Sequence, residues 1–437
     1  MIIYSPTITH RLNYLADFTG RYLTGQPARI TSDPAEYCAA AGPRINYSAE
    51  RITTDEVWVA PHGLLSESGL QEQATACFEW KGYPAFFQTN GDIPFDMFAA
   101  IFFLLSRYEE YLPHGKDSYG RFAHTQSLAC REGFLDQPLV NHWLVMLGKE
   151  LEHRFPGFTI AEQRFRFIPT YDIDEAYSFR YKQWWRSAGA ALKDLARGQW
   201  KRFAQRRRVL NGLETDPYDA FSWMDDLHRP ARDKVHPRYF FLVADVTKGY
   251  DRNNPPDQPH IQALVRRLAE DYPAGLHPSW QSGDDPALLQ QEKDRLERMT
   301  GIKISASRQH YIRFELPRTY RTLAEAGIRE DYSMGYGSIN GFRASVASPF
   351  YWYDLEREQT TALLLYPFCF MEANAFFEEG LSAMQALDEM YRYYHAVRKV
   401  NGLFITVWHN TFLGTDPLYR GWREAYAQFF REATAAL

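Results

Sequence analysis

The stretch Arg164-Phe-Arg-Phe-Ile-Pro-Thr-Tyr171, followed by Asp172-Ile173-Asp174, decides the fold of the larger part of the chain. A mostly apolar run that ends in two acids predicts a buried strand whose carboxyl end reaches an edge of a sheet. Asp172 and Asp174 lie two positions apart, so their side chains share one side of the strand. In parallel α/β folds, ligands and catalytic groups gather at that edge. The alternative is a strand end with two solvated acids, because Asp is common after strands.

Beyond residue 164, strand-like and helix-like stretches alternate, which indicates parallel strands with crossover helices. The predicted strands are residues 165–171, 238–243, 275–277, 304–307, 361–370 and 403–408. The predicted helices are residues 261–270, 286–299, 320–326, 381–397 and 421–435. With this many strands, we expect an α/β fold in which residues 161–437 form an incomplete (β/α) barrel.

Residues 1–160 predict a smaller α/β domain that precedes the barrel. Its expected strands are residues 1–4 and 56–60, and its expected helices are residues 11–23, 94–111 and 138–154. Its histidines are scattered, so we expect a supporting or partner-binding role for it.

Composition narrows the functional class. The chain has 437 residues, 45% of them apolar and 16% aromatic, which is enough to bury a large core and line a cleft for sugar rings. A net charge of −5 gives no general reason to expect nucleic acid as a partner. The four cysteines are far apart and predict reduced thiols. With no signal peptide and no apolar run near ~18 residues, we expect a cytoplasmic protein.

An insertion over residues 180–230 separates the first two predicted strands of the barrel. It contains many cations, including the triplet Arg206-Arg207-Arg208, interleaved with Trp184, Trp185 and Trp200. A basic amphipathic helix of this kind could contact an anionic membrane surface or an acidic glycan. The alternative is a solvated helix that packs its tryptophans on the barrel.

Polar side chains recur at the later strand ends and predict a shared site there. The stretches are Gly275-Leu-His277-Pro-Ser-Trp280-Gln281, Ser307-Arg308-Gln-His310, Asp331-Tyr-Ser-Met-Gly-Tyr336, Gly341-Phe-Arg343 and Trp408-His409-Asn410. Together with Asp172-Ile173-Asp174 as the first motif, and in this order, they resemble the five motifs of the polysaccharide deacetylase superfamily (carbohydrate esterase family 4, the NodB homology domain). The closest subgroup has an Asp-Val-Asp first motif and an extra N-terminal domain, and often accompanies exopolysaccharide genes.

The resemblance covers about residues 160–415 and implies roles for the matching residues. Asp172 corresponds to the general base, Arg308 to the arginine that orients it, and Asp331 to the acid that tethers this charge network. His409 corresponds to the general acid that protonates the leaving amine. Asp174 and His277 correspond to ligands of a divalent metal, of which zinc is the expected one.

One departure concerns the third metal ligand. The second histidine of the family's His-x-x-x-His motif falls at Gln281, and an amide is a poor zinc ligand. We expect His310, from a neighbouring strand end, to complete the set with Asp174 and His277. A single histidine near a strand end is otherwise more often a hydrogen-bonded structural residue.

Three further residues are predicted to contact the sugar, namely Arg343, Tyr336 and Trp280. Arg343 would bind an anionic sugar or phosphate through two hydrogen bonds. The alternative for Arg343 is a surface arginine after a bulge.

These expectations define a hydrolase acting on carbon–nitrogen bonds other than peptide bonds. It would remove N-acetyl, or O-acetyl, groups from a polysaccharide or glycan precursor with the help of a metal. The alternative is a catalytically degenerate protein that binds a glycan or a partner on the same barrel. A glycosidase using Asp172 or Asp174 with Glu175 fits less well, because paired glycosidase acids usually face each other from different strands.

Overall fold

A nine-stranded sheet organises the second part of the chain in the computed structural model, which describes residues 1–437 apart from the side chain of Arg186. Its strand order is β12-β13-β11-β10-β9-β8-β7-β15-β14. The strands are β7 Arg166–Ile173, β8 Arg238–Phe241, β9 Ala274–Leu276, β10 Ala306–Ser307, β11 Glu330–Asp331, β12 Phe350–Asp354, β13 Gln359–Leu365, β14 Phe370–Met371 and β15 Leu403–His409. All neighbours are parallel except β12, which is antiparallel to β13.

The predicted α/β class with a large parallel-rich sheet is therefore confirmed. One predicted strand, residues 361–370, is wrong in detail, because β13 and β14 lie at different positions in the sheet. β12 and β14 are the two edge strands of this sheet. The incomplete barrel therefore stays a prediction.

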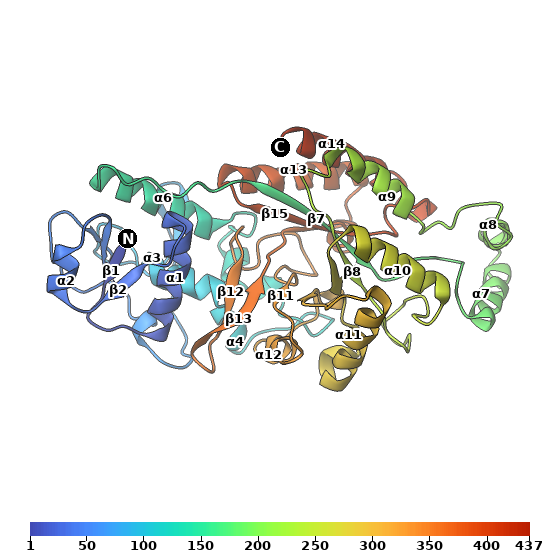
Figure 1. Cartoon of the computed structure of the whole chain (residues 1–437), viewed down its shortest axis with the longest axis horizontal. Coiled ribbons are helices and arrows are strands. Elements are labelled where there is room, and N and C mark those ends of the chain that lie inside the picture. Colours follow the sequence, from blue (N-terminus) through green and yellow to red (C-terminus); the bar gives the residue numbers. More distant parts are fainter.

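Helices connect and cover these strands (Figure 1). They are α7 Trp184–Ala196, α8 Trp200–Leu210, α9 Phe221–His228, α10 Pro259–Asp271, α11 Pro286–Thr300, α12 Arg318–Glu325, α13 Ala383–Lys399 and α14 Trp422–Ala435. Local sequence explains several of their ends. Asp285 caps α11 through its side chain, and Ser382 with Gln385 forms a capping box at the start of α13.

The register of β15 on β7 positions the site. The seven pairs run from Leu403 opposite Arg166 to His409 opposite Asp172. His409, the last residue of β15, and Asp172 are thus direct neighbours at the carboxyl edge of the sheet, although 237 positions (409 minus 172) separate them in the sequence.

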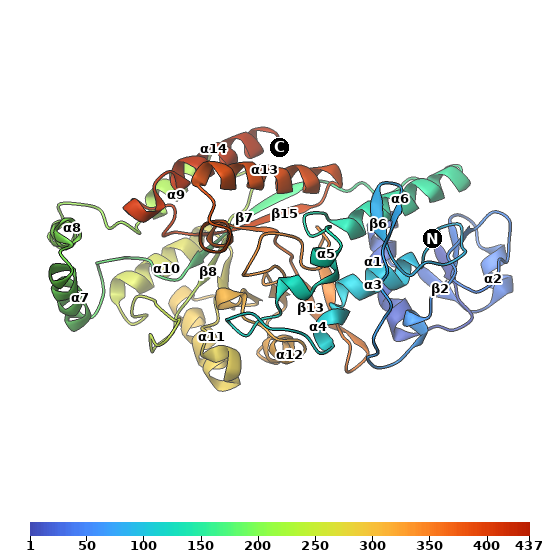
Figure 2. The same ribbon diagram turned by 180° about the vertical axis from the view of Figure 1, so that it is seen from behind.

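The first part of the chain carries its own parallel sheet in the order β2-β1-β3-β4. Its strands are β1 Ile2–Tyr4, β2 Arg29–Thr31, β3 Arg44–Asn46 and β4 Val57–Trp58, followed by the hairpin β5 Phe78–Trp80 and β6 Tyr83–Ala85. Its helices are α1 His10–Thr24, α2 Pro34–Ala39, α3 Met97–Leu105, α4 Tyr108–Tyr111, α5 Leu128–Arg131 and α6 Leu139–Arg154. Figure 2 shows this part at one end of the molecule, next to β13.

The single helix predicted for residues 94–111 is two helices. Arg107, between α3 and α4, has a φ of 54° and is almost fully buried, with ion pairs to Glu109 and Glu110. These contacts hold a backbone conformation that is uncommon for non-glycine residues. The division into domains at residue 160 stays a prediction.

Candidate active site and metal centre

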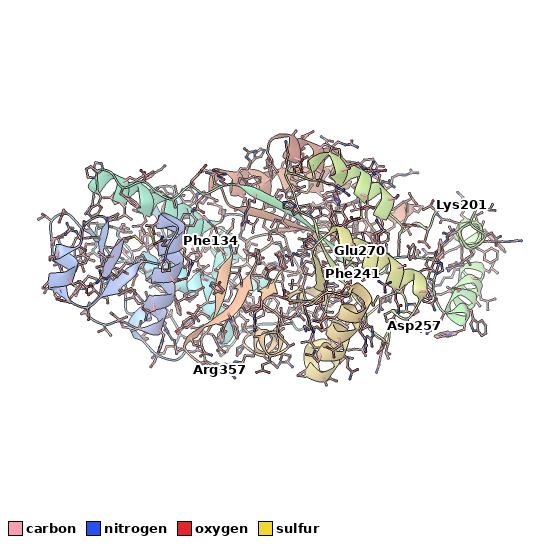
Figure 3. All side chains as sticks on the ribbon, viewed as in Figure 1. Phe134, Lys201, Phe241, Asp257, Glu270 and Arg357 are labelled. Atoms are coloured by element: carbon pink, nitrogen blue, oxygen red, sulfur yellow. The ribbon has the colours of Figure 1, made fainter. Side chains whose placement is uncertain are left out.

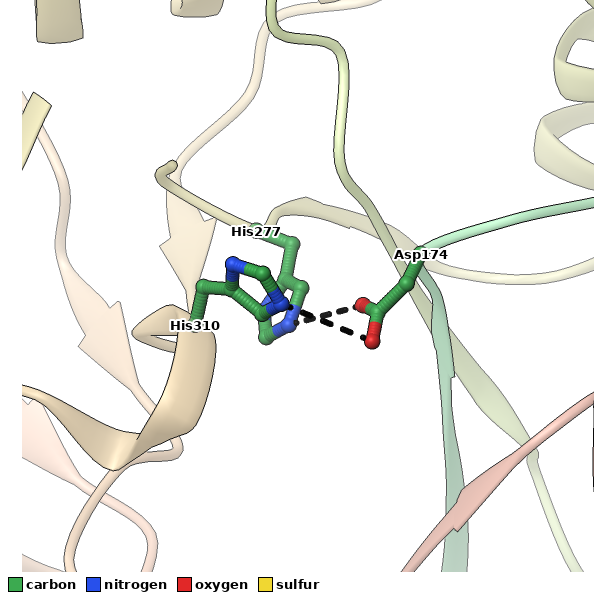
Figure 4. Close-up of side chains that lie close together, drawn as sticks. All are labelled: Asp174, His277 and His310. Atoms are coloured by element: carbon green, nitrogen blue, oxygen red, sulfur yellow. Dashed lines mark ion pairs between the residues drawn. The ribbon is translucent and has the colours of Figure 1, made fainter. Parts of the chain in front are cut away.

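Three predicted metal ligands meet at the carboxyl edge of the large sheet (Figure 4). Asp174 follows β7, His277 follows β9 and His310 follows β10, and their ligand atoms all lie within 4.8 Å of one another. Nε2 of His277 lies 3.2 Å from Oδ1 of Asp174, and Nε2 of His310 lies 3.6 Å from its Oδ2. Both histidines are buried.

The hydrogen bonds of the two imidazoles decide which nitrogen faces the carboxylate. Nδ1 of His277 lies 2.6 Å from the carbonyl oxygen of Arg308, and Nδ1 of His310 lies 3.0 Å from Oδ1 of Asp251. Because both partners are acceptors, each Nδ1 carries a proton, and Nε2 is the nitrogen that faces Asp174 in each imidazole. Among the described residues, neither Oδ1 of Asp174 nor Nε2 of His277 has a hydrogen-bond partner. Three acceptors facing one another fit a divalent cation.

The pKa shifts of His310 and Asp174 also favour a cation at this site. Burial disfavours a charged His310, yet the neighbouring Asp174 raises the pKa of His310 to about 9. Burial likewise opposes ionisation of Asp174, but His310 and His277 hold the pKa of Asp174 well below its usual range. The pocket therefore favours positive charge beside the carboxylate, and either a proton or a metal ion supplies it.

Asp172 stands next to this cluster and is held by Arg308. Nη1 of Arg308 donates to Oδ1 of Asp172 at 2.9 Å and to Oγ1 of Thr170 at 2.6 Å, and both members of the ion pair are buried. The other oxygen of Asp172 lies 3.9 Å from Nε2 of His277. The predicted pairing of Asp172 with Arg308 is present in the structure.

His409 approaches the same carboxylate from the other side. Its Nε2 lies 3.6 Å from Oδ2 of Asp174, and its Nδ1 and backbone N–H both contact Oε1 of Glu372 at 2.6 Å. Burial alone would lower the pKa of His409, but Glu372 outweighs it and raises the pKa to about 10. The imidazole is therefore a proton donor at neutral pH.

Glu372 and Asp251 contact residues of the candidate site, and the sequence prediction missed both. Glu372 is fully buried directly after β14, and Asp251 is buried in the loop after β8. Both follow strand ends, which is the signal that could have found them. That signal was hidden for Glu372, because residues 361–370 read as one continuous strand. For Asp251 it was hidden by the Asn- and Pro-rich loop around it.

Gln281, in place of the histidine expected as a ligand, contacts Asp251 and Val246. Its Nε2 donates to Oδ2 of Asp251 at 3.0 Å and to the carbonyl of Val246 at 2.9 Å, and its backbone N–H also reaches Asp251. The side chain therefore supports the carboxylate behind His310 instead of entering the ligand cluster.

Asp331 lies behind the site, without exposure. Its carboxylate accepts from the hydroxyls of Ser307 and Ser333, and Ser333 in turn accepts from the backbone N–H of Gln309. Burial raises the pKa of Asp331 to about 6. Asp331 thus fixes both chain neighbours of Arg308, Ser307 directly and Gln309 through Ser333.

The structure corrects two predicted sugar contacts. Arg343 is 1% exposed and binds Glu110 through two hydrogen bonds, of 2.8 and 2.6 Å, so its guanidinium is already occupied. Tyr336 is 1% exposed, and Nη2 of Arg107 lies 3.4 Å from its hydroxyl. Trp280 is half-buried, with its ring centroid 4.3 Å from that of Tyr250, and it is not among the described residues that line the cavity.

A cavity of about 630 Å³ opens over the cluster. Its floor includes Asp172, Asp174, His277, His310 and His409. Its walls are rich in aromatic side chains, namely Tyr119, Tyr311, Phe377, Phe412 and Tyr419.

Comparisons with known proteins give two kinds of likeness. A family of unknown function, DUF7033, matches residues 1–156, and none of the curated proteins matches the sequence. A structure from Mycobacterium smegmatis, assigned as a polysaccharide deacetylase, is similar with a TM-score of 0.40 and 14% identity, over 63% of this chain and 85% of that one.

Two further solved structures are similar at lower scores. A polysaccharide deacetylase from Bacillus cereus has a TM-score of 0.28 and 10% identity, over 62% of this chain and 88% of that one. A CE4 family pseudoenzyme from Bacillus anthracis has a TM-score of 0.33 and 8% identity, over 62% of each chain. All three likenesses are distant, so function has to be argued from the side chains of the site.

Proposed function

We propose that this protein is a metal-dependent deacetylase that hydrolyses N-acetyl, or O-acetyl, groups on a polysaccharide or glycan precursor. The observation that carries the proposal is the placement of three metal-binding side chains, Asp174, His277 and His310, beside the buried Asp172 and beside His409, whose Nδ1 contacts Glu372. The same residues would hold the ion, and zinc suits a set of two imidazoles and one carboxylate.

The chain's own residues divide the proton transfers. Asp172, oriented by Arg308, accepts a proton from the attacking water as the new C–O bond forms. His409, oriented by Glu372, donates a proton to the amide nitrogen as the C–N bond breaks. The products are acetate and the free amine. When bound, the divalent ion supplies Lewis-acid polarisation of the acetyl carbonyl and a lower pKa for water.

The shape of the cavity supports a carbohydrate substrate. Aromatic rings around a polar floor present flat apolar faces, against which the C–H faces of a sugar ring pack well. Tyr119 and Tyr311 form one pair of lining rings with centroids 5.4 Å apart, and Phe412 and Tyr419 form another with centroids 4.0 Å apart. A sugar ring stacked on either pair would lie in the cavity that Asp174 and His409 also line.

The test is acetate release by the zinc-loaded protein from acetylated oligosaccharides, with chitin fragments for the amide and acetylated xylan fragments for the ester. Release should disappear in His310→Ala together with the metal, and persist in the control His395→Ala, which removes an exposed histidine in α13. Zinc retained without acetate release from any of these substrates would instead favour the alternative of a glycan- or partner-binding protein.

A further inference from the structure

The connection between β7 and β8 carries a pair of helices that extends from the end of the molecule opposite β1 (Figures 1 and 2). This α7–α8 hairpin is fastened on its inner side. Nη2 of Arg206 lies 2.8 Å from Oδ2 of Asp194, which joins the two helices, and the Arg206 guanidinium lies 4.5 Å from the ring centroid of Phe179. The hairpin is therefore a built element with a distinct outer face.

The outer face of α7 is apolar and exposed. Trp184 is 81% exposed, Trp185 53% and Leu192 67%, which contradicts the expected alternative that the tryptophans pack on the body of the protein. The exposed small residues between and beyond them continue the stripe, and they are Ala188, Gly189 and Ala196. Positions spaced by three and four residues form one helix face, so the exposed stripe is continuous.

The same hairpin is strongly basic. Residues 184–210 contain eight Lys and Arg residues and one acid, Asp194, whereas the whole chain has a net charge of −5. The acid is buried against Arg206. The exposed cations are Lys193, Arg197, Lys201, Arg202, Arg207 and Arg208. Lys201 lies at the outer end of the molecule (Figure 3). This local excess of positive charge is complementary to an anionic partner.

An apolar helix face flanked by cations matches the interfacial region of an anionic bilayer, where tryptophan is favoured. An acidic glycan would use the cations but gives no reason for the stripe of Leu192 and alanines. A second copy of this acidic chain would also complement the cations, so the oligomeric state is one arm of the test. In the described part of the chain, no helix is long and apolar enough to cross a membrane. We propose that the α7–α8 hairpin docks the protein peripherally on a bilayer of anionic phospholipid, with Trp184 and Leu192 among the headgroups.

The test is co-sedimentation of the full chain with vesicles of phosphatidylglycerol and phosphatidylcholine, beside vesicles of phosphatidylcholine alone. Binding is expected only to the anionic vesicles and should weaken in high salt. Trp184→Ala with Leu192→Ala should weaken it about tenfold or more, because two apolar side chains lose their burial. Lys201→Gln with Arg207→Gln should also weaken it about tenfold or more.

Matched controls remove equivalent groups elsewhere. Met384→Ala with Ile302→Ala removes exposed apolar side chains, and Lys149→Gln with Arg298→Gln removes the same charge, so neither pair should change binding. Thermal unfolding should be unchanged in the hairpin variants, because their side chains are exposed. Equal binding to both vesicles, or an unaffected Trp184→Ala/Leu192→Ala variant, would overturn the proposal. Two further results would overturn it if no vesicle binding is seen. One is a dimer in light scattering that the Trp184→Ala/Leu192→Ala variant loses, and the other is binding to the polyanion dextran sulfate that this variant loses.

Discussion

Asp251 accepts Nδ1–H of His310 at 3.0 Å and so fixes the nitrogen with which His310 faces Asp174. Outer partners of this kind orient a metal-binding imidazole and strengthen it as a ligand. Asp251 belongs to a loop rather than to a strand, and it is held there by the backbone N–H of Trp280 at 2.7 Å and by Gln281.

Asp251→Asn should therefore weaken zinc binding by about 10–100-fold without abolishing it. The measurement is competition for zinc with a chromophoric chelator. Asp245→Asn is the control, because it changes the same group in the same loop, where Asp245 is half-exposed and pairs with Arg295. Equal affinities in the two variants would show that His310 does not depend on Asp251 for binding.

Gln281→His should not restore the ligand of the family motif. The side chain at this position donates to Oδ2 of Asp251 and to the carbonyl of Val246, whereas His310 contacts Oδ1 of Asp251. We expect the double variant Gln281→His/His310→Ala to be as poor in zinc as His310→Ala alone, measured by mass spectrometry of the metal content. Recovery of one zinc per chain would mean that the loop can turn this residue into the site.

Glu372→Gln should lower acetate release by about 100-fold or more while the zinc content stays the same. Its carboxylate keeps the imidazole of His409 charged and oriented, but it does not belong to the ligand cluster. The control is Glu378→Gln, which changes another acid at the same cavity. Loss of zinc in Glu372→Gln would assign the residue to the metal site, and unchanged release would remove His409 from the proposed proton transfer.

The sequence predicted the elements that depend on local pattern. The apolar run before Asp172 became β7, and the acids and histidines after β7, β9 and β10 met at one edge, because parallel strands end together. His310 could be proposed for the place left by Gln281 because strands that follow one another along the chain are usually neighbours. β9 and β10 are indeed paired.

What the sequence did not predict depends on contacts between distant segments. Arg343 looked available for a ligand because nothing near it in the chain is acidic, but its partner Glu110 lies 233 positions away. Glu372 was hidden because the break between β13 and β14 has no strong turn signal. Neither residue carries a local pattern that distinguishes burial from function.

Glu110→Gln should destabilise the whole fold, since it breaks the buried contacts of Glu110 with Arg343 and Arg107. Burial opposes its ionisation, but the two arginines lower the pKa of Glu110 from 4.5 to about 2. The ion pair thus stabilises the folded state above about pH 4.5, and the stabilisation is lost as the pH falls toward 2. In urea unfolding at pH 7, we expect the free energy of unfolding to fall by about 3–5 kcal/mol. The difference from the unmodified protein should shrink below pH 4.5.

The control Glu150→Gln removes a partly exposed pair with Arg154 and should cost less than about 1 kcal/mol. If Glu110→Gln cost no more than this control, the buried ion pair with Arg343 would not stabilise the contact between the first 160 residues and the large sheet, and other contacts such as Arg11 with Glu358 would have to hold it.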